Sequence, residues 1–146
     1  MSKRLAVILG ACALLSAAVP VWAHHAFAAE FDANKPIKFK GTVSKMEWIN
    51  PHAWIHIDVK GDDGKVATWM IEAAAPNSLL RRGFTKYSLL AGTEIVVEGF
   101  QAKDGSNRAN GSVITFTDGR KLFVGNAAGD PGAAPGAPGA TDKTDK

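Results

Sequence analysis

Strict alternation of apolar and polar residues constrains the fold of this chain more than any other feature. Residues 37–44 read Ile-Lys-Phe-Lys-Gly-Thr-Val-Ser, and residues 53–59 read Ala-Trp-Ile-His-Ile-Asp-Val. A β-strand turns successive side chains to opposite faces, so a period of two residues marks a strand with one buried face. Both stretches are therefore predicted to be half-buried strands.

Turn and cap residues predict the remaining elements. Gly61-Asp62-Asp63-Gly64 is a strong turn signal, so the second strand should fold back as a hairpin onto residues 65–72. Residues 76–83 predict a short helix, with Asn77 or Ser78 as its N-cap and Gly83 as its stop. Further strands are expected at residues 93–101, 111–117 and 121–124.

This order of elements predicts an all-β fold. Three strands, one short helix and then further strands are typical of the small OB-like five-stranded barrel, with the helix between strands 3 and 4. Gly41, midway along a long first strand, suits the bend that such a barrel needs. A small β-sandwich or β-roll of another topology is the alternative.

The first 23 residues have the anatomy of a secretory signal peptide. Lys3 and Arg4 precede an apolar run at residues 5–19, and Pro20 ends that run before the expected cleavage after Ala23. A run of about fifteen residues is short for a membrane span, which needs roughly 20, and no second run follows. We expect residues 1–23 to be removed and the mature protein to be periplasmic or secreted, with lipoprotein processing at Cys12 as the alternative.

The mature chain should consist of a domain at residues 24–125 and a disordered tail at residues 126–146, which is rich in Gly, Ala and Pro. Removal of Lys3 and Arg4 lowers the formal net charge from +3 to +1, so bulk charge gives no strong nucleic-acid signal. Loss of Cys12, the single cysteine, excludes disulfides within the mature chain and thiolate metal clusters.

The four histidines are the most informative candidates for chemistry: His24, His25, His52 and His56. A mature N-terminal His24 offers its α-amine and its imidazole, and Cu(II) favours such nitrogen-rich sites. His25 would add a backbone or ring nitrogen, and His52 or His56 a crossing ligand. The other interpretation is that His24 and His25 form only an exposed polar start to the chain.

Strand geometry limits which of these side chains meet. His52 and His56 would lie about 13 Å apart on a straight strand, too far for one metal ion. His56 and Asp58 would lie about 6.6 Å apart on one face and can share a site. His52 joins them only if the Asn50-Pro51-His52 turn directs its ring inward, and otherwise satisfies backbone groups at that turn.

Aromatic residues offer a second candidate surface. Trp54 falls on the polar face beside His56, and with Trp48 and Asp58 it would form a ligand face for an oligosaccharide, a peptide or an exported protein. The alternative is that the tryptophans complete a small core, because each buries a large area.

Signatures of enzymes are absent from the sequence. It contains no Gly-x-Ser-x-Gly elbow, phosphate loop or His-Glu-x-x-His motif, and its carboxylates have no spacing that assigns acid and base roles. We therefore expect an exported binding module, with copper or another divalent ion as its ligand. An oxidative copper enzyme built on the same histidines is the further alternative.

Several short motifs are distinctive in this chain: His24-His25-Ala26-Phe27, Glu30-Phe31-Asp32, Gly41-Thr42-Val43, Glu47-Trp48 followed by Asn50-Pro51-His52-Ala53-Trp54, residues 75–83, and Lys103-Asp104-Gly105-Ser106. Together they resemble a family of small secreted bacterial proteins of unknown function and, more distantly, an OB-like group of exported domains. The resemblance covers nearly all of residues 24–125. It implies secretion and an OB-like fold, and it supplies no catalytic residue.

Overall fold

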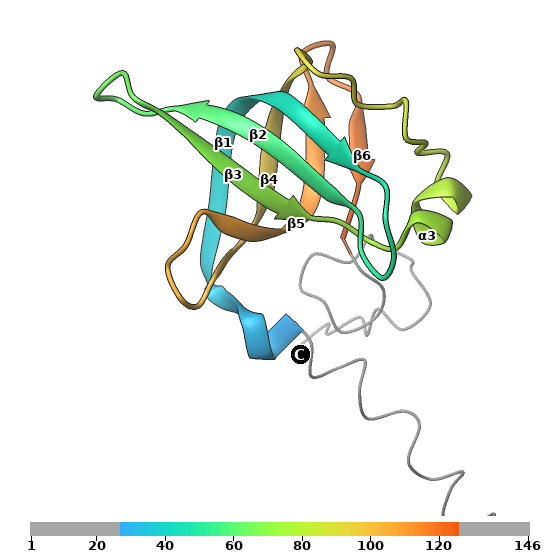
Figure 1. Cartoon of the computed structure of the whole chain (residues 1–146), viewed down its shortest axis with the longest axis horizontal. Coiled ribbons are helices and arrows are strands. Elements are labelled where there is room, and N and C mark those ends of the chain that lie inside the picture. The colour runs from blue at the N-terminus through green and yellow to red at the C-terminus, as the bar shows by residue number, and fades with distance from the viewer. Residues whose placement is uncertain (1–26, 126–146) are drawn as a thin grey trace, which may run out of the picture.

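The strands predicted from the alternation are present in the computed structural model, which describes residues 27–125. Six strands and one helix follow each other along the chain (Figure 1): β1 (Phe31–Glu47), β2 (Trp54–Lys60), β3 (Val66–Glu72), α3 (Pro76–Arg81), β4 (Glu94–Ala102), β5 (Arg108–Phe116) and β6 (Lys121–Phe123). Residues 27–30, just before β1, are helical. The protein is therefore mostly β-sheet, with few helical residues in the described region.

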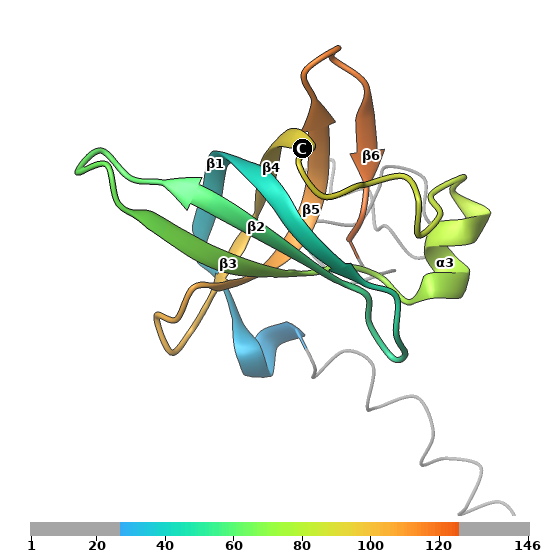
Figure 2. The same ribbon diagram turned by 45° about the horizontal axis from the view of Figure 1, so that its top comes forward.

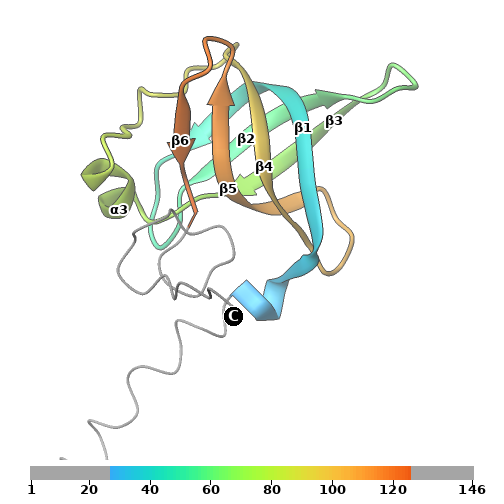
Figure 3. The ribbon, with the colours of Figure 1, turned by 180° about the vertical axis from the view of Figure 1, so that it is seen from behind.

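One twisted sheet contains all six strands, in the order β3-β2-β1-β4-β5-β6. Neighbours in this order are antiparallel, and β3 also pairs with β5 in parallel through residues 70–72 and 108–110. Seen from behind, β1, β4, β5 and β6 lie in front, while β2 and β3 cross behind them (Figure 3). The strand expected at residues 121–124 is present as β6 and pairs with β5, so the sheet has one strand more than the five of the OB-like barrel.

β1 is the longest strand and changes partner along its length. Its first part pairs with β4 and its last part with β2, and Thr42 lies opposite both Glu94 and Asp58. At the neighbouring Gly41, a Cβ would stand 3.0 Å from the carbonyl oxygen of Asp58, so the backbones approach closely there. This close approach explains the glycine in the middle of the strand.

The hairpin of β2 and β3 forms at the predicted turn, with Gly64 at φ +77°. It extends away from the rest of the sheet (Figure 2). The helix is also present, and Gly83, at φ +77°, follows its end as expected.

The predicted N-cap of this helix is wrong. Ala75 is the cap residue, without a side-chain hydrogen bond, and Pro76 opens the first turn. The φ angle of proline already suits the first helical position, which moves the start ahead of Asn77 and Ser78. Among the described residues, no helix is long and apolar enough to cross a bilayer.

The core lies on the concave side of the sheet. Its largest fully buried members come from the inward positions of the strands and from the segment around α3: Val43, Ile55, Ile57, Ile71, Leu79, Phe84, Ile95, Val97, Ile114 and Val124. Trp54, His56 and Asp58 alternate with Ile55 and Ile57 along β2 and are only half-buried. The alternation in the sequence thus separates a buried face from an outer face that can carry polar chemistry.

Candidate functional site

The structure describes two of the four histidines of the predicted site, His52 and His56. His24 and His25 lie outside the described residues. Within residues 27–125, no group of three or more His, Cys, Asp or Glu side chains is arranged to hold a metal ion. The described residues therefore contain no complete metal site of their own.

His52 is held by a buried carboxylate. The loop between β1 and β2 places its Nδ1 atom 2.9 Å from Oε1 of Glu72, the last residue of β3. The Glu72 residue is only 6% exposed, whereas the His52 side chain is 29% exposed. Nδ2 of the buried Asn110 donates to the same Oε1 atom over 3.4 Å. Because Nδ1 is engaged, Nε2 is the ring nitrogen that remains for another ligand.

Burial controls the protonation of Glu72. Loss of solvent raises the pKa of this carboxyl group above its ordinary value, and the negative charge of Glu30 raises it further, while His52 and Arg108 oppose the shift. An imidazole beside a desolvated carboxylate has a fixed ring orientation, because rotation would leave the carboxylate without that partner.

The first described residues dock at this same end of the sheet. The carboxylate of Glu30 lies 3.0 Å from Arg108 at the start of β5, and its carbonyl oxygen accepts a hydrogen bond from the Lys103 backbone over 2.9 Å. The Lys103 side chain also donates to the carbonyl oxygen of Ala28. The segment that follows His24 and His25 in the chain is thus anchored at the start of β5, and Glu30 lies near enough to Glu72 to raise the pKa of its carboxyl group.

His56 and Asp58 share the outer face of β2 but have different partners. Nε2 of His56 is buried, lies 3.7 Å from Oε1 of Glu47 and has no hydrogen-bond partner in the described residues. Asp58 instead accepts a hydrogen bond of 2.7 Å from the hydroxyl of Thr68. The structure therefore directs His56 toward β1 and Asp58 toward β3.

The tryptophans occupy two different environments. Trp54 lies on the outer face, where the guanidinium of Arg108 sits 5.3 Å from its ring centre. Trp48 stacks on the buried Phe84 at 6.1 Å and packs against the core. The structure thus does not bring Trp48 and Trp54 together as one aromatic surface.

Sequence reasoning missed Glu72, Asn110, Glu30 and Arg108 as members of the site. The sequence did contain one signal for Glu72. This residue stands between Ile71 and a run of three alanines, and a carboxylate in such an apolar stretch is rarely buried unless it has a partner. Its partner, His52, could not be inferred, because only the register of β2 against β3 brings the two together.

The fold and the site define a small, mostly β-sheet protein whose distinctive chemical feature is a partly exposed imidazole, His52, held by the buried carboxylate of Glu72. Its sequence matches the model of DUF6152, a family of unknown function, over residues 11–111, and the chain belongs to this family. The match spans the predicted N-terminal histidines, His52 and Glu72. No curated protein and no solved structure matched the chain.

Proposed function

We propose that this protein is an exported binding module for copper or a related divalent ion, with the ion held by the mature N-terminus and by His52. The observation that carries the proposal is the 2.9 Å contact between His52 Nδ1 and the buried Glu72 carboxylate. Metal-binding histidines almost always donate their other ring N–H to such a carboxylate, which fixes the tautomer and orients the free nitrogen. His52 has this arrangement already.

Three nitrogen donors would come from the mature N-terminus. Cleavage after Ala23 would expose the α-amine of His24, and its imidazole and a nitrogen of His25 would complete the set that Cu(II) favours. Docking of residues 27–30 beside Glu72 supports this model. Phe27 is held on the sheet, and the three residues from His24 to Phe27 span at most about 10 Å. The mature N-terminus would therefore stay within about 10 Å of Phe27.

His52 is favoured over His56 as the crossing ligand. The His52 side chain is the more exposed of the two, 29% against 18%, and its carboxylate partner is on the β3 side beside the docked segment. His56 Nε2 is turned toward Glu47 instead. The aromatic face is the weaker candidate, because Arg108 lies over the Trp54 ring and Trp48 packs against the core.

We also propose that the sheet closes as the OB-like five-stranded barrel. The pairing of β3 with β5 supports closure, because β1, β2, β3, β5 and β4 then form a continuous ring of neighbours. This connectivity is compatible with the small Greek-key barrel expected from the order of elements. Export to the periplasm or beyond remains part of the proposal and depends on the signal peptide at residues 1–23.

A Cu(II) titration of protein that begins at His24, as checked by intact mass, tests the proposal. One extra residue before His24, or His24→Ala, should weaken binding at least tenfold, since either change removes part of the N-terminal chelate. His52→Ala should weaken it as well, and Glu72→Gln should cost about 10–100-fold, the usual effect of changing a carboxylate behind a metal-binding histidine.

His56→Ala is the matched control and should leave the affinity unchanged. Equal binding by the native and the extended proteins would contradict a site at the N-terminus. Weaker binding by His24→Ala together with full binding by His52→Ala would retain the N-terminal chelate and remove His52 from the site. Turnover of an added reductant under oxygen would extend the proposal to an oxidative enzyme.

A further inference from the structure

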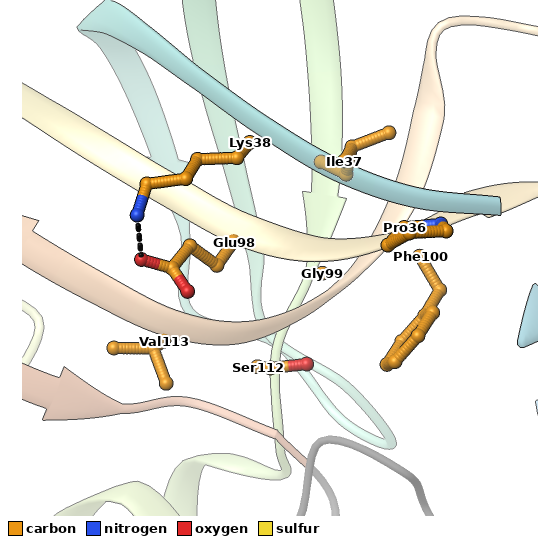
Figure 4. Close-up of a pocket in the computed structure, with 8 residues that line it drawn as sticks. All are labelled: Pro36, Ile37, Lys38, Glu98, Gly99, Phe100, Ser112 and Val113. Atoms are coloured by element: carbon orange, nitrogen blue, oxygen red, sulfur yellow. Dashed lines mark ion pairs between the residues drawn. The ribbon is translucent and has the colours of Figure 1, made fainter.

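A hollow on the outer face of the sheet lies apart from the His52 site. It has a volume of about 460 Å³ and forms where β1, β4 and β5 run side by side (Figure 4). Small-molecule sites in proteins occupy roughly 300–1,000 Å³. The hollow is thus large enough for a small ligand, and the site proposed for copper does not use it.

An irregularity in strand pairing creates the hollow. Glu98 lies opposite Val113, but the next residue, Gly99, lies opposite Gly111, so β5 carries Ser112 as an extra residue. Such a β-bulge re-aims the side chains around it and is common next to functional sites. Here Ser112 and Val113 both line the hollow.

Two glycines keep the backbone of the bulge close-packed. A Cβ on Gly99 would stand 2.1 Å from the carbonyl oxygen of Asn110, and one on Gly111 would stand 2.7 Å from a methyl group of Ile71. Both distances are too short for a side chain without movement of the neighbouring atoms. A larger residue at Gly99 or Gly111 would therefore push the strands apart and change the shape of the backbone beneath the hollow.

The charged groups of the hollow neutralise each other, and one of its polar groups lacks a hydrogen-bond partner in the described residues. Nζ of Lys38 and Oε1 of Glu98 pair at 2.9 Å on one side of the hollow (Figure 4). Oγ of Ser112 is buried without a hydrogen-bond partner in the described residues. A buried hydroxyl without a partner is costly, and a ligand that bonds to it after a turn of the Ser112 side chain into the hollow removes that cost.

An apolar wall faces the polar groups. Pro36 and Phe100 lie on the side of the hollow away from the ion pair, and the Ser112 hydroxyl oxygen is on the side facing Phe100 (Figure 4). The ring of Phe27 packs edge-on against Phe100 at 5.7 Å and supports it from the docked N-terminal segment. The hollow thus combines an aromatic surface with a donor, an acceptor and a hydroxyl.

We infer that this hollow binds a neutral carbohydrate unit. A sugar ring has an apolar face of C–H groups that can lie on Phe100, and hydroxyl groups that both donate and accept. Those hydroxyls match the unpartnered Ser112 hydroxyl, the Lys38 donor and the Glu98 acceptor. A charged sugar fits less well, because Lys38 and Glu98 already neutralise each other.

The inference is tested by NMR titration of ¹⁵N-labelled protein with glucose, galactose, N-acetylglucosamine and maltose, and with glucuronate as the charged comparison. At least one neutral sugar should shift the amide resonances of residues 98–100 and 112–113, with saturation. Ser112→Ala should weaken this binding at least threefold, and Ser112→Val, which also fills space, should abolish it. Glucuronate should bind more weakly than glucose.

Ser106→Ala is the matched control, since the Ser106 hydroxyl bonds to Asp104 outside the hollow, and it should bind as the unchanged protein does. The spectrum of each variant shows whether it is folded, and Ser112→Ala decides the question if the valine variant is not. No saturable shifts with any neutral sugar would overturn the inference, as would unchanged affinity in Ser112→Ala. Because no metal is added, the outcome is independent of the copper proposal.

Discussion

Glu72 is the residue of the candidate site whose negative charge is most costly to bury. Its carboxyl group is buried at the end of β3 and accepts contacts from His52 and Asn110. Burial raises its pKa, although His52 and Arg108 lower it in part. Between pH 4.5, its ordinary pKa, and the raised value, the folded protein holds a proton that the unfolded chain has released.

The stability of the protein should therefore depend on pH through Glu72. The contribution of the neutral carboxyl group is fully present below pH 4.5 and is lost as the pH rises through the folded-state pKa. Glu72→Gln removes this titration, so the free energy of unfolding of the variant should rise relative to the unchanged protein across that window. Urea unfolding at a series of pH values measures the difference.

Glu94→Gln supplies the control for this experiment. Glu94 is an exposed carboxylate paired with Lys40, so its substitution should shift the free energy of unfolding by less than about 1 kcal/mol. A constant difference between Glu72→Gln and the unchanged protein from pH 4 to pH 8 would show that the Glu72 pKa is not raised.

At the scale of elements, the contact between residues 27–30 and the start of β5 holds the N-terminal segment against the sheet. Arg108 bonds to Glu30 and also lies over the Trp54 ring. Both contacts are partly exposed, so they orient the N-terminal segment while adding little to global stability. Their loss should free this segment from the sheet and leave the strands paired.

Arg108→Ala should therefore increase the hydrogen-exchange rate of the Lys103 amide, which donates to the Glu30 carbonyl oxygen. Its free energy of unfolding should fall by no more than about 1 kcal/mol. Arg120→Ala is a close match, because Arg120 also combines a carboxylate, Asp118, with an aromatic ring, Phe116. Equal Lys103 exchange in the two variants would contradict the docking role of Arg108.

The sequence predicts those elements whose pattern is local. Alternation locates β2, and a glycine turn locates its hairpin partner, because each signal lies within a few residues. The start of β1 has no such pattern: Phe31 pairs with Ala102 and Pro36 with Phe100, contacts that only the folded sheet provides. The His52–Glu72 contact is likewise provided only by the folded sheet, because it depends on the register of β2 against β3.

At the scale of the whole molecule, the single core determines stability. Ile57 is fully buried among residues from several strands, and residues 27–125 contain no cysteine that could support the core through a disulfide. Ile57→Ala should lower the free energy of unfolding by about 2–5 kcal/mol, measured by urea denaturation. Ile49→Ala is the control: Ile49 is 50% exposed and should cost much less.

A cooperative loss of all strands together is expected in Ile57→Ala, because one core serves the whole sheet. Unfolding of β5 and β6 in a separate transition, seen by different amides losing protection at different urea concentrations, would contradict a single core.

The parallel contact between β3 and β5 also sets an order of events during synthesis. β3 ends at Glu72, but the strand that covers its edge begins only at Arg108. Until that later part of the chain has been made, β3 presents unpaired backbone groups to whatever is nearby. A nascent chain that stops short of β5 is therefore an aggregation hazard, and a helper that shields unfinished chains has its clearest target at residues 70–72 of β3.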